Sequence, residues 1–222
     1  MRTIYYDIET GPLPIEELRA MLPPFDPLDV KLGNLKDIDK IKEKLALAEA
    51  AHESDFIERA ALDPLTGRVW AIGTLEGYDF RIIHNDGNEA ELLAEFWAII
   101  RGDMDRINQM VGFNTHLFDL PFLVRRSWKH RVPIPAGVRN GRYWGNQFID
   151  LRDHWQLGDR MAKGSLAAIA RHLGLGDKAG NGKDFARLWT GAHNERLQAV
   201  DYLKRDVELT ARDRKSTRLN SS

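Results

Sequence analysis

The chain has 222 residues, of which 43 % are hydrophobic and 29 % charged, and its formal net charge is −1. This balance is that of an ordinary globular protein, and the charge of the whole chain indicates no class of partner. The length fits one α/β domain with an insertion, or a small domain with an appendage. Because cysteine is absent, disulfides, thiolate zinc sites and cysteine nucleophiles are excluded.

Nothing in the sequence indicates a membrane protein. No apolar run approaches the roughly 20 residues that a membrane-spanning helix needs. The first residues, MRTIYYDIET, read as a β-strand and lack the apolar region of a signal peptide. We therefore expect no membrane contact and a cytoplasmic location.

A strand is predicted first, over residues 2–8, and a Gly-Pro pair ends it. Residues 14–65 then form an insertion that is Pro-rich at its start and helical over 37–61, with Asp37 as the N-cap. The part from 14 to 62 is acidic, with seven Lys/Arg against eleven Asp/Glu. It is therefore a poor candidate for phosphate contact.

The remainder of the chain alternates strands and helices. Strands are predicted over 69–75, 80–84, 107–113 and 148–151, and helices over 88–101, 116–130, 164–173, 184–190 and 193–213. Short turns join the early strands, which indicates antiparallel neighbours, and helices separate the later ones, which indicates parallel crossovers. We predict an α/β fold with a mixed five-stranded central sheet and helices on both faces.

The last residues, 214–222, are polar and have no apolar period. We expect them to be a disordered tail, or a scar of cloning or sequencing, outside a domain that covers residues 1–213.

Three short motifs carry candidate chemistry. The first is Asp7-Ile8-Glu9, at the end of the predicted first strand. Side chains of a strand alternate between faces, so both carboxylates point to one side while Ile8 points into the opposite, apolar layer. Two carboxylates so close disfavour joint ionisation unless a cation lies between them. An isolated D-x-E is common, but this pair ends a hydrophobic strand, where ligands of α/β sheets gather.

The second motif follows the strand predicted over 107–113. A polar turn carries Asn114 and His116, and Asp119 then opens a helix. A carboxylate in the first helical turn is also a common cap, so Asp119 alone indicates little. The third motif is Tyr202-Leu203-Lys204-Arg205-Asp206, in which the phenol and the carboxylate, four residues apart, share one face of a helix.

Together these motifs resemble those of the DnaQ-like 3′–5′ exonuclease superfamily, the DEDD exonucleases, which have an RNase H-like fold. The family has D-x-E, then an aspartate after an asparagine-bearing turn, then Y-x-x-x-D or H-x-x-x-x-D. The residue five before Asp206 is Asp201, not histidine, so the chain resembles the tyrosine subclass. The resemblance is closest to the proofreading-type exonuclease domain of family B DNA polymerases, and it covers residues 1–13 and 66–213.

The resemblance implies a metal-dependent nuclease that acts on the 3′ end of a single strand, DNA rather than RNA. Two divalent cations, Mg²⁺ or Mn²⁺, would be bound by four carboxylates, and Tyr202 would orient the attacking water. The implied ligands are Asp7, Glu9, Asp119 and Asp206. The implied substrate contacts are Thr10, Leu13, Asn114 and Phe118.

The charge distribution is consistent with a nucleic-acid partner. Residues 120–171 contain ten Lys/Arg and three Asp, a local balance of +7. Basic side chains interleaved with aromatic rings suit a single strand, through phosphate pairing and base stacking. The basic residues are Arg125, Arg126, Lys129, Arg131, Arg139, Arg142, Arg152, Arg160, Lys163 and Arg171, and the aromatic ones Trp128, Tyr143, Trp144 and Trp155.

Two alternatives remain open. An RNase H-like endonuclease or an RNA-trimming nuclease would use the same four carboxylates. A non-catalytic nucleic-acid-binding module with this fold is disfavoured, because all four acids and Tyr202 are present. The sequence indicates no particular protein partner.

Overall fold

The computed structural model describes residues 2–84, 87–101, 108–135, 138, 147–159, 161–176 and 182–219. The chain divides into two compact units, Met1–Thr10 with Val69–Ser222, and Gly11–Arg68. The second unit contains the predicted insertion. The domain boundaries stay a prediction. No helix in the described part of the chain is long and apolar enough to cross a membrane.

The first unit is organised around a five-stranded sheet of order β3-β2-β1-β4-β5. Its strands are β1 (Thr3–Pro12), β2 (Gly67–Glu76), β3 (Asp79–Ile83), β4 (Gln109–Gly112) and β5 (Phe148–Asp150). β2 and β3 are antiparallel, whereas β4 is parallel to both β1 and β5. The predicted mixed five-stranded sheet is confirmed.

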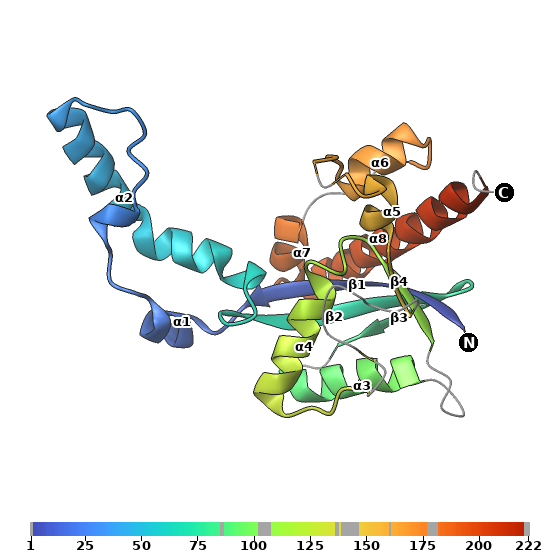
Figure 1. Cartoon of the computed structure of the whole chain (residues 1–222). Coiled ribbons are helices and arrows are strands. Elements are labelled where there is room, and N and C mark those ends of the chain that lie inside the picture. The colour runs from blue at the N-terminus through green and yellow to red at the C-terminus, as the bar shows by residue number, and fades with distance from the viewer. Residues whose placement is uncertain are drawn as a thin grey trace. The chain divides into compact units, whose positions relative to one another are not determined.

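Helices cover both faces of this sheet (Figure 1). The helices of this unit are α3 (Glu89–Arg101), α4 (Asp119–His130), α5 (Leu151–Gln156), α6 (Leu166–His172), α7 (Gly182–Trp189) and α8 (His193–Leu219). A first core lies between the sheet and α3 and α4, and a second core between the sheet and α7 and α8. The parallel strands β1, β4 and β5 end at one edge of the sheet, where side chains from both layers can meet.

The alternation of β1 assigns its residues to the two layers. Ile4, Tyr6 and Ile8 are buried in the first core, and Tyr5 packs against the second. The odd-numbered residues of β1 therefore face α8, which is the side on which Asp7 lies.

Gly73 allows α8 to approach the sheet closely. A Cβ atom at this position of β2 would lie 2.8 Å from Leu203 Cγ and 3.1 Å from Val207 Cγ2. Both of these α8 residues are fully buried. A larger residue in place of Gly73 would push the helix away from the strand.

Helix α8 extends past the predicted end at residue 213 and runs to Leu219. Residues 214–219 are therefore helical, and the prediction of a disordered tail or a scar over 214–222 stays a prediction. Arg214 is 4 % exposed, and its Nη2 donates a hydrogen bond to Gln109 Oε1 at 2.5 Å. A partner 105 residues away in the sequence fixes this part of the helix, and no local pattern encodes such a contact.

The second unit is helical, with α1 (Ile15–Met21), η1 (Pro27–Asp29), α2 (Ile38–Arg59) and η2 (Ala60–Leu62). The predicted cap is confirmed, because the Asp37 carboxylate accepts hydrogen bonds from the amides of Asp39 and Lys40. Helix α1 lies in the Pro-rich start of the insertion, where no helix was predicted. Helix α2 has no buried residue.

Candidate active site

Three carboxylates from two distant segments meet at one place in the first unit. Asp7 and Glu9 come from β1, and Asp206 comes from α8, where it is 1 % exposed. One carboxylate oxygen of each lies within 4.8 Å of those of the other two. Ile8, between the first two, is buried in the first core, as the alternation of the strand predicts.

Asp119 is joined to the same strand from the opposite layer. It opens α4, is 4 % exposed, and its Oδ1 accepts a hydrogen bond of 3.3 Å from the backbone N–H of Ile8. Burial raises the pKa of Asp119 well above its usual value, and the negative charge of Asp7 raises it further. A carboxyl in this position is therefore best stabilised by a proton or by a cation.

Tyr202 lies one helical turn before Asp206 on α8. It is 5 % exposed and belongs to the second core, with its ring centroid 6.2 Å from that of Phe185. Packing alone accounts for the ring, so a role for the hydroxyl has to be tested separately from a role for the ring.

The turn between β4 and α4 is fixed by contacts to both neighbouring strands. Asn114 has a left-handed backbone with φ of 61°, and Asp150, at the end of β5, accepts its N–H. On the other side, the hydroxyls of Tyr6 and Thr115 are hydrogen bonded to each other. A Cβ at Gly112 would lie 2.9 Å from Thr115 Cβ, so the start of this turn leaves no space for a side chain.

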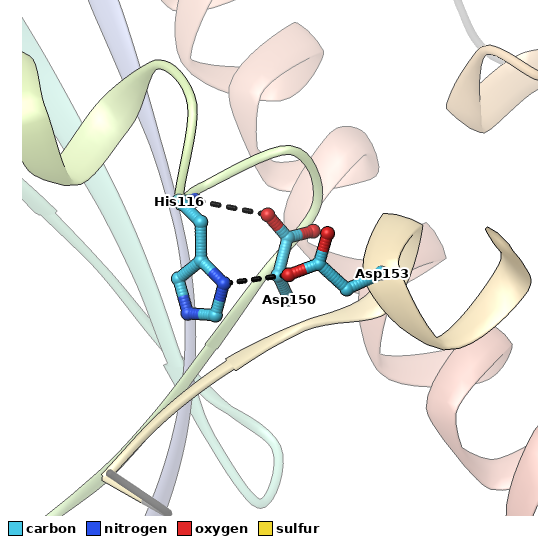
Figure 2. Close-up of side chains that lie close together, drawn as sticks. All are labelled: His116, Asp150 and Asp153. Carbon is cyan, nitrogen blue, oxygen red and sulfur yellow. Dashed lines mark hydrogen bonds and ion pairs between the residues drawn. The ribbon is translucent and has the colours of Figure 1, made fainter. Parts of the chain in front are cut away.

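A second group of side chains, His116, Asp150 and Asp153, also has ligand atoms within 4.8 Å of one another (Figure 2). These atoms already take part in hydrogen bonds. Asp150 accepts from the backbone N–H groups of Asn114, His116 and Arg152, and His116 Nδ1 lies 2.7 Å from Asp153 Oδ2. We therefore interpret this group as a hydrogen-bonded network that holds the turn, and not as a cation site.

Comparison with known proteins supports the fold that these contacts describe. A family model described as the RNase H superfamily matches residues 56–211. The chain belongs to the RNase H superfamily. The matched stretch contains Asp119, Tyr202 and Asp206, while Asp7 and Glu9 lie before it. No curated protein sequence matches significantly.

Membership in the RNase H superfamily agrees with a solved structure. The family B DNA polymerase from the hyperthermophilic archaeon Pyrobaculum calidifontis matches with a TM-score of 0.62 and 16 % sequence identity. The match covers 95 % of this chain and 24 % of the polymerase, so the chain spans about a quarter of that protein's length. At this identity the likeness establishes the fold, and the predicted RNase H-like fold is confirmed.

The proposed substrate contacts of this RNase H-like domain lie in different surroundings. Thr10 is a partly exposed residue of β1. Phe118 is partly buried against the first core, with its ring centroid 5.6 Å from that of Phe122. Leu13 belongs to the Gly11–Arg68 unit. All three stay predictions.

Arg126, which the sequence assigns to the basic nucleic-acid segment, is buried. Its side chain donates to both carboxylate oxygens of Glu89, at 2.9 and 2.6 Å. Burial raises the pKa of Glu89, but hydrogen bonds from Arg126, the Val69 amide and His130 outweigh it and leave the pKa below its usual value. Arg126 is 3 % exposed, so the prediction that it contacts nucleic acid is wrong.

The other members of that segment differ in exposure. Arg125, Trp128, Lys129, Arg131, Lys163 and Arg171 are exposed. Arg139, Arg142, Tyr143, Trp144 and Arg160 lie outside the described residues. Arg152 and Trp155 are partly exposed, so a nucleic-acid surface built on this segment would use them together with the first group.

No motif assigned Asp150 a role in the site, and the sequence assigned Arg152 only to the basic segment. Asp150 is 2 % exposed, and Arg152 Nη1 donates a hydrogen bond of 2.6 Å to Asn114 Oδ1. The signal in the sequence was the position of Asp150 at the end of β5, which is parallel to β4, the strand that precedes the Asn114 turn. Its partners lie 34 and 36 residues earlier in the chain.

Proposed function

We propose that this protein is a 3′–5′ exonuclease that hydrolyses phosphodiester bonds from the 3′ end of a single strand by a two-metal mechanism. The observation that carries the proposal is the convergence of Asp7, Glu9 and Asp206 within 4.8 Å, with Asp119 bonded to the same strand. DNA is favoured over RNA because the matched structure is a DNA polymerase.

The donor set fits a hard divalent cation. Carboxylate oxygens are the ligands that Mg²⁺ and Mn²⁺ prefer, and four carboxylates offset the charge of two such ions. Asp7, Glu9 and Asp206 would hold one ion, and Asp7 with Asp119 would hold the second. When bound, a pair of divalent cations stabilises the charge on the attacking and leaving oxygens of an in-line displacement.

The remaining residues of the site would bind the substrate strand and orient the attacking water. Tyr202 would hold the attacking water by a hydrogen bond, since a phenol is a poor base at neutral pH. Phe118 and Thr10 would contact the terminal nucleotide. An endonuclease or an RNA-trimming nuclease would use the same carboxylates, so only the products distinguish these activities.

The test uses single-stranded DNA and RNA with a 5′ label, each with a free or a blocked 3′ end, in Mg²⁺, Mn²⁺ or EDTA. We expect stepwise shortening of free-ended DNA with either metal and none in EDTA. Asp7→Asn and Asp206→Asn should remove nearly all activity. Glu208→Gln, a change on the same helix, is the matched control and should keep it.

Each failure identifies a different alternative. Internal cuts in end-blocked strands would indicate an endonuclease, and faster cleavage of RNA would indicate an RNA-trimming enzyme. Binding of either strand without any metal-dependent cleavage would indicate a non-catalytic module.

A further inference from the structure

A single buried carboxylate fixes the backbone of the turn that leads to Asp119. Asp150 Oδ1 accepts the N–H of Asn114 at 2.8 Å, and Asp150 Oδ2 accepts the N–H of His116 at 2.9 Å. Figure 2 shows the second of these bonds. Asp150 ends β5, which pairs with β4, so these bonds fix the position of the turn relative to the ends of both strands.

Arg152 acts on the side chain of the same turn residue. Its own N–H is also bonded to Asp150, at 2.9 Å, and its Nη1 donates to Asn114 Oδ1 at 2.6 Å. A guanidinium can only donate hydrogen bonds, so it must face the amide oxygen of Asn114 and not the amide nitrogen. Among the described residues, Asn114 Nδ2 has no bonded partner. The side chain of Asn114 is therefore oriented with its donor end available.

The turn is also tied to the strand that carries the carboxylates. Thr115 is bonded to Tyr6 of β1, and Asp119 Oδ1 to the Ile8 amide between Asp7 and Glu9. Asn114 is thus fixed relative to β1 from one side and relative to β5 from the other. A donor held in this way loses little conformational entropy when it meets an acceptor.

We propose that Asp150 and Arg152 are positioning residues that present Asn114 Nδ2 as a hydrogen-bond donor to an oxygen of the bound nucleic-acid strand. This inference rests on the proposed function and names one of its substrate contacts. Arg152 acts through Asn114, so the two side chains form one energetic unit.

A double-mutant cycle tests this coupling. Asn114→Ala, Arg152→Met and the double variant are compared with wild type for binding of fluorescein-labelled oligo(dT) in EDTA and for KM and kcat in Mg²⁺. Each single change should weaken binding and raise KM about five- to tenfold, with a smaller effect on kcat, as expected for loss of one hydrogen bond. The double variant should be no weaker than the worse single variant.

Further variants separate positioning from other effects. Lys42→Met removes an exposed positive charge from α2, in the acidic insertion, and should leave KM unchanged. Arg152→Lys keeps a donor and should restore part of the loss. Asn114→Asp keeps the acceptor that faces Arg152 but cannot donate, so it should resemble Asn114→Ala. Asp150→Asn, where it folds, should also raise KM, and Mn²⁺ affinity should stay the same in every variant.

The outcomes distinguish failure of the inference from failure of the proposed function. If wild type cleaves but the effects of Asn114→Ala and Arg152→Met add, Arg152 acts through its charge alone and the inference is overturned. If these variants melt at lower temperatures but keep the KM of wild type, the network has only a structural role, and the inference is overturned as well. If wild type itself neither binds nor cleaves the strand, the proposed function fails first.

Discussion

At the scale of single residues, Tyr202 distinguishes a functional hydroxyl from a buried ring. Tyr202→Phe keeps the ring, its packing near Phe185 and the helix, and it removes only the hydroxyl. If this hydroxyl orients the attacking water, single-turnover cleavage should slow by about 10²–10⁴. Mn²⁺ affinity should barely change, because the four carboxylates remain.

Tyr202→His should not restore that rate. The histidine motif places its side chain five residues before the aspartate, and one residue rotates a helical side chain by about 100°. If Tyr202→Phe cleaves within about twofold of wild type, the hydroxyl has no catalytic role. The assignment to the tyrosine subclass would then be wrong.

Arg125 and Arg126 are neighbours in the sequence, but only the buried Arg126 is expected to stabilise the fold. Replacing Arg126 by Ala leaves the Glu89 carboxylate buried without its main partner, which typically costs about 3–5 kcal/mol. Arg125 is exposed, so Arg125→Ala should change the free energy of unfolding by less than about 0.5 kcal/mol. Urea denaturation of the two variants makes the comparison. Similar losses of stability in both would contradict the assigned role of Arg126.

At the scale of elements, the contact between α8 and β2 controls where Asp206 lies. Gly73→Ala places a methyl group 2.8 Å from Leu203 Cγ and should cost about 1–3 kcal/mol through overpacking. Because α8 carries Asp206, we also expect weaker Mn²⁺ binding, measured by calorimetry. An unchanged Mn²⁺ affinity in the folded variant would show that the site tolerates movement of this helix.

The same element offers an internal control. Leu203→Ala alone should cost about 2–5 kcal/mol, because Leu203 is fully buried. In the Gly73→Ala, Leu203→Ala double variant the new methyl group occupies space that the leucine leaves. The combined loss of stability should therefore be smaller than the sum of the two single losses.

The elements also explain how far the sequence could predict the site. Strand alternation alone places Asp7 and Glu9 opposite Ile8, and helical periodicity predicts most of α3 and α4. Arg126 and Asp150 differ, because their partners lie 37 and 34–36 residues away and no local pattern encodes them. The short helix α1 was missed for a similar reason, since helices of this length depend more on tertiary contacts than on propensity.

At the scale of the whole molecule, the clustered carboxylates link stability to pH and to metal. Burial and then the charge of Asp7 raise the pKa of Asp119 above its unfolded value. The folded protein therefore holds this proton more tightly than the unfolded chain. The protonated Asp119 carboxyl therefore stabilises the folded state fully at a pH below the pKa of the unfolded chain. This stabilisation is lost as the pH rises towards the pKa of the folded state. Glu89, with a lowered pKa, contributes in the opposite direction, so the effect has to be measured as a difference between variants.

Asp119→Asn isolates this effect. The amide oxygen can still accept the Ile8 N–H, but the side chain no longer ionises. Without metal, the variant should melt above wild type at neutral pH, because it avoids the cost of a buried carboxyl beside Asp7. The gain should be about 2–4 °C for each 1 kcal/mol of that cost. This gain should shrink as pH falls to about 4, near the ordinary pKa of aspartate.

With saturating Mn²⁺ the order of the melting temperatures should reverse. An ion that binds only the folded state stabilises wild type more than a variant that lacks one of the carboxylates holding the ion. Asp201→Asn, an exposed carboxylate on α8, should show neither effect. A metal-free Asp119→Asn protein that melts below wild type at every pH would mean that burial and the charge of Asp7 do not disfavour the ionised Asp119 carboxylate in the fold.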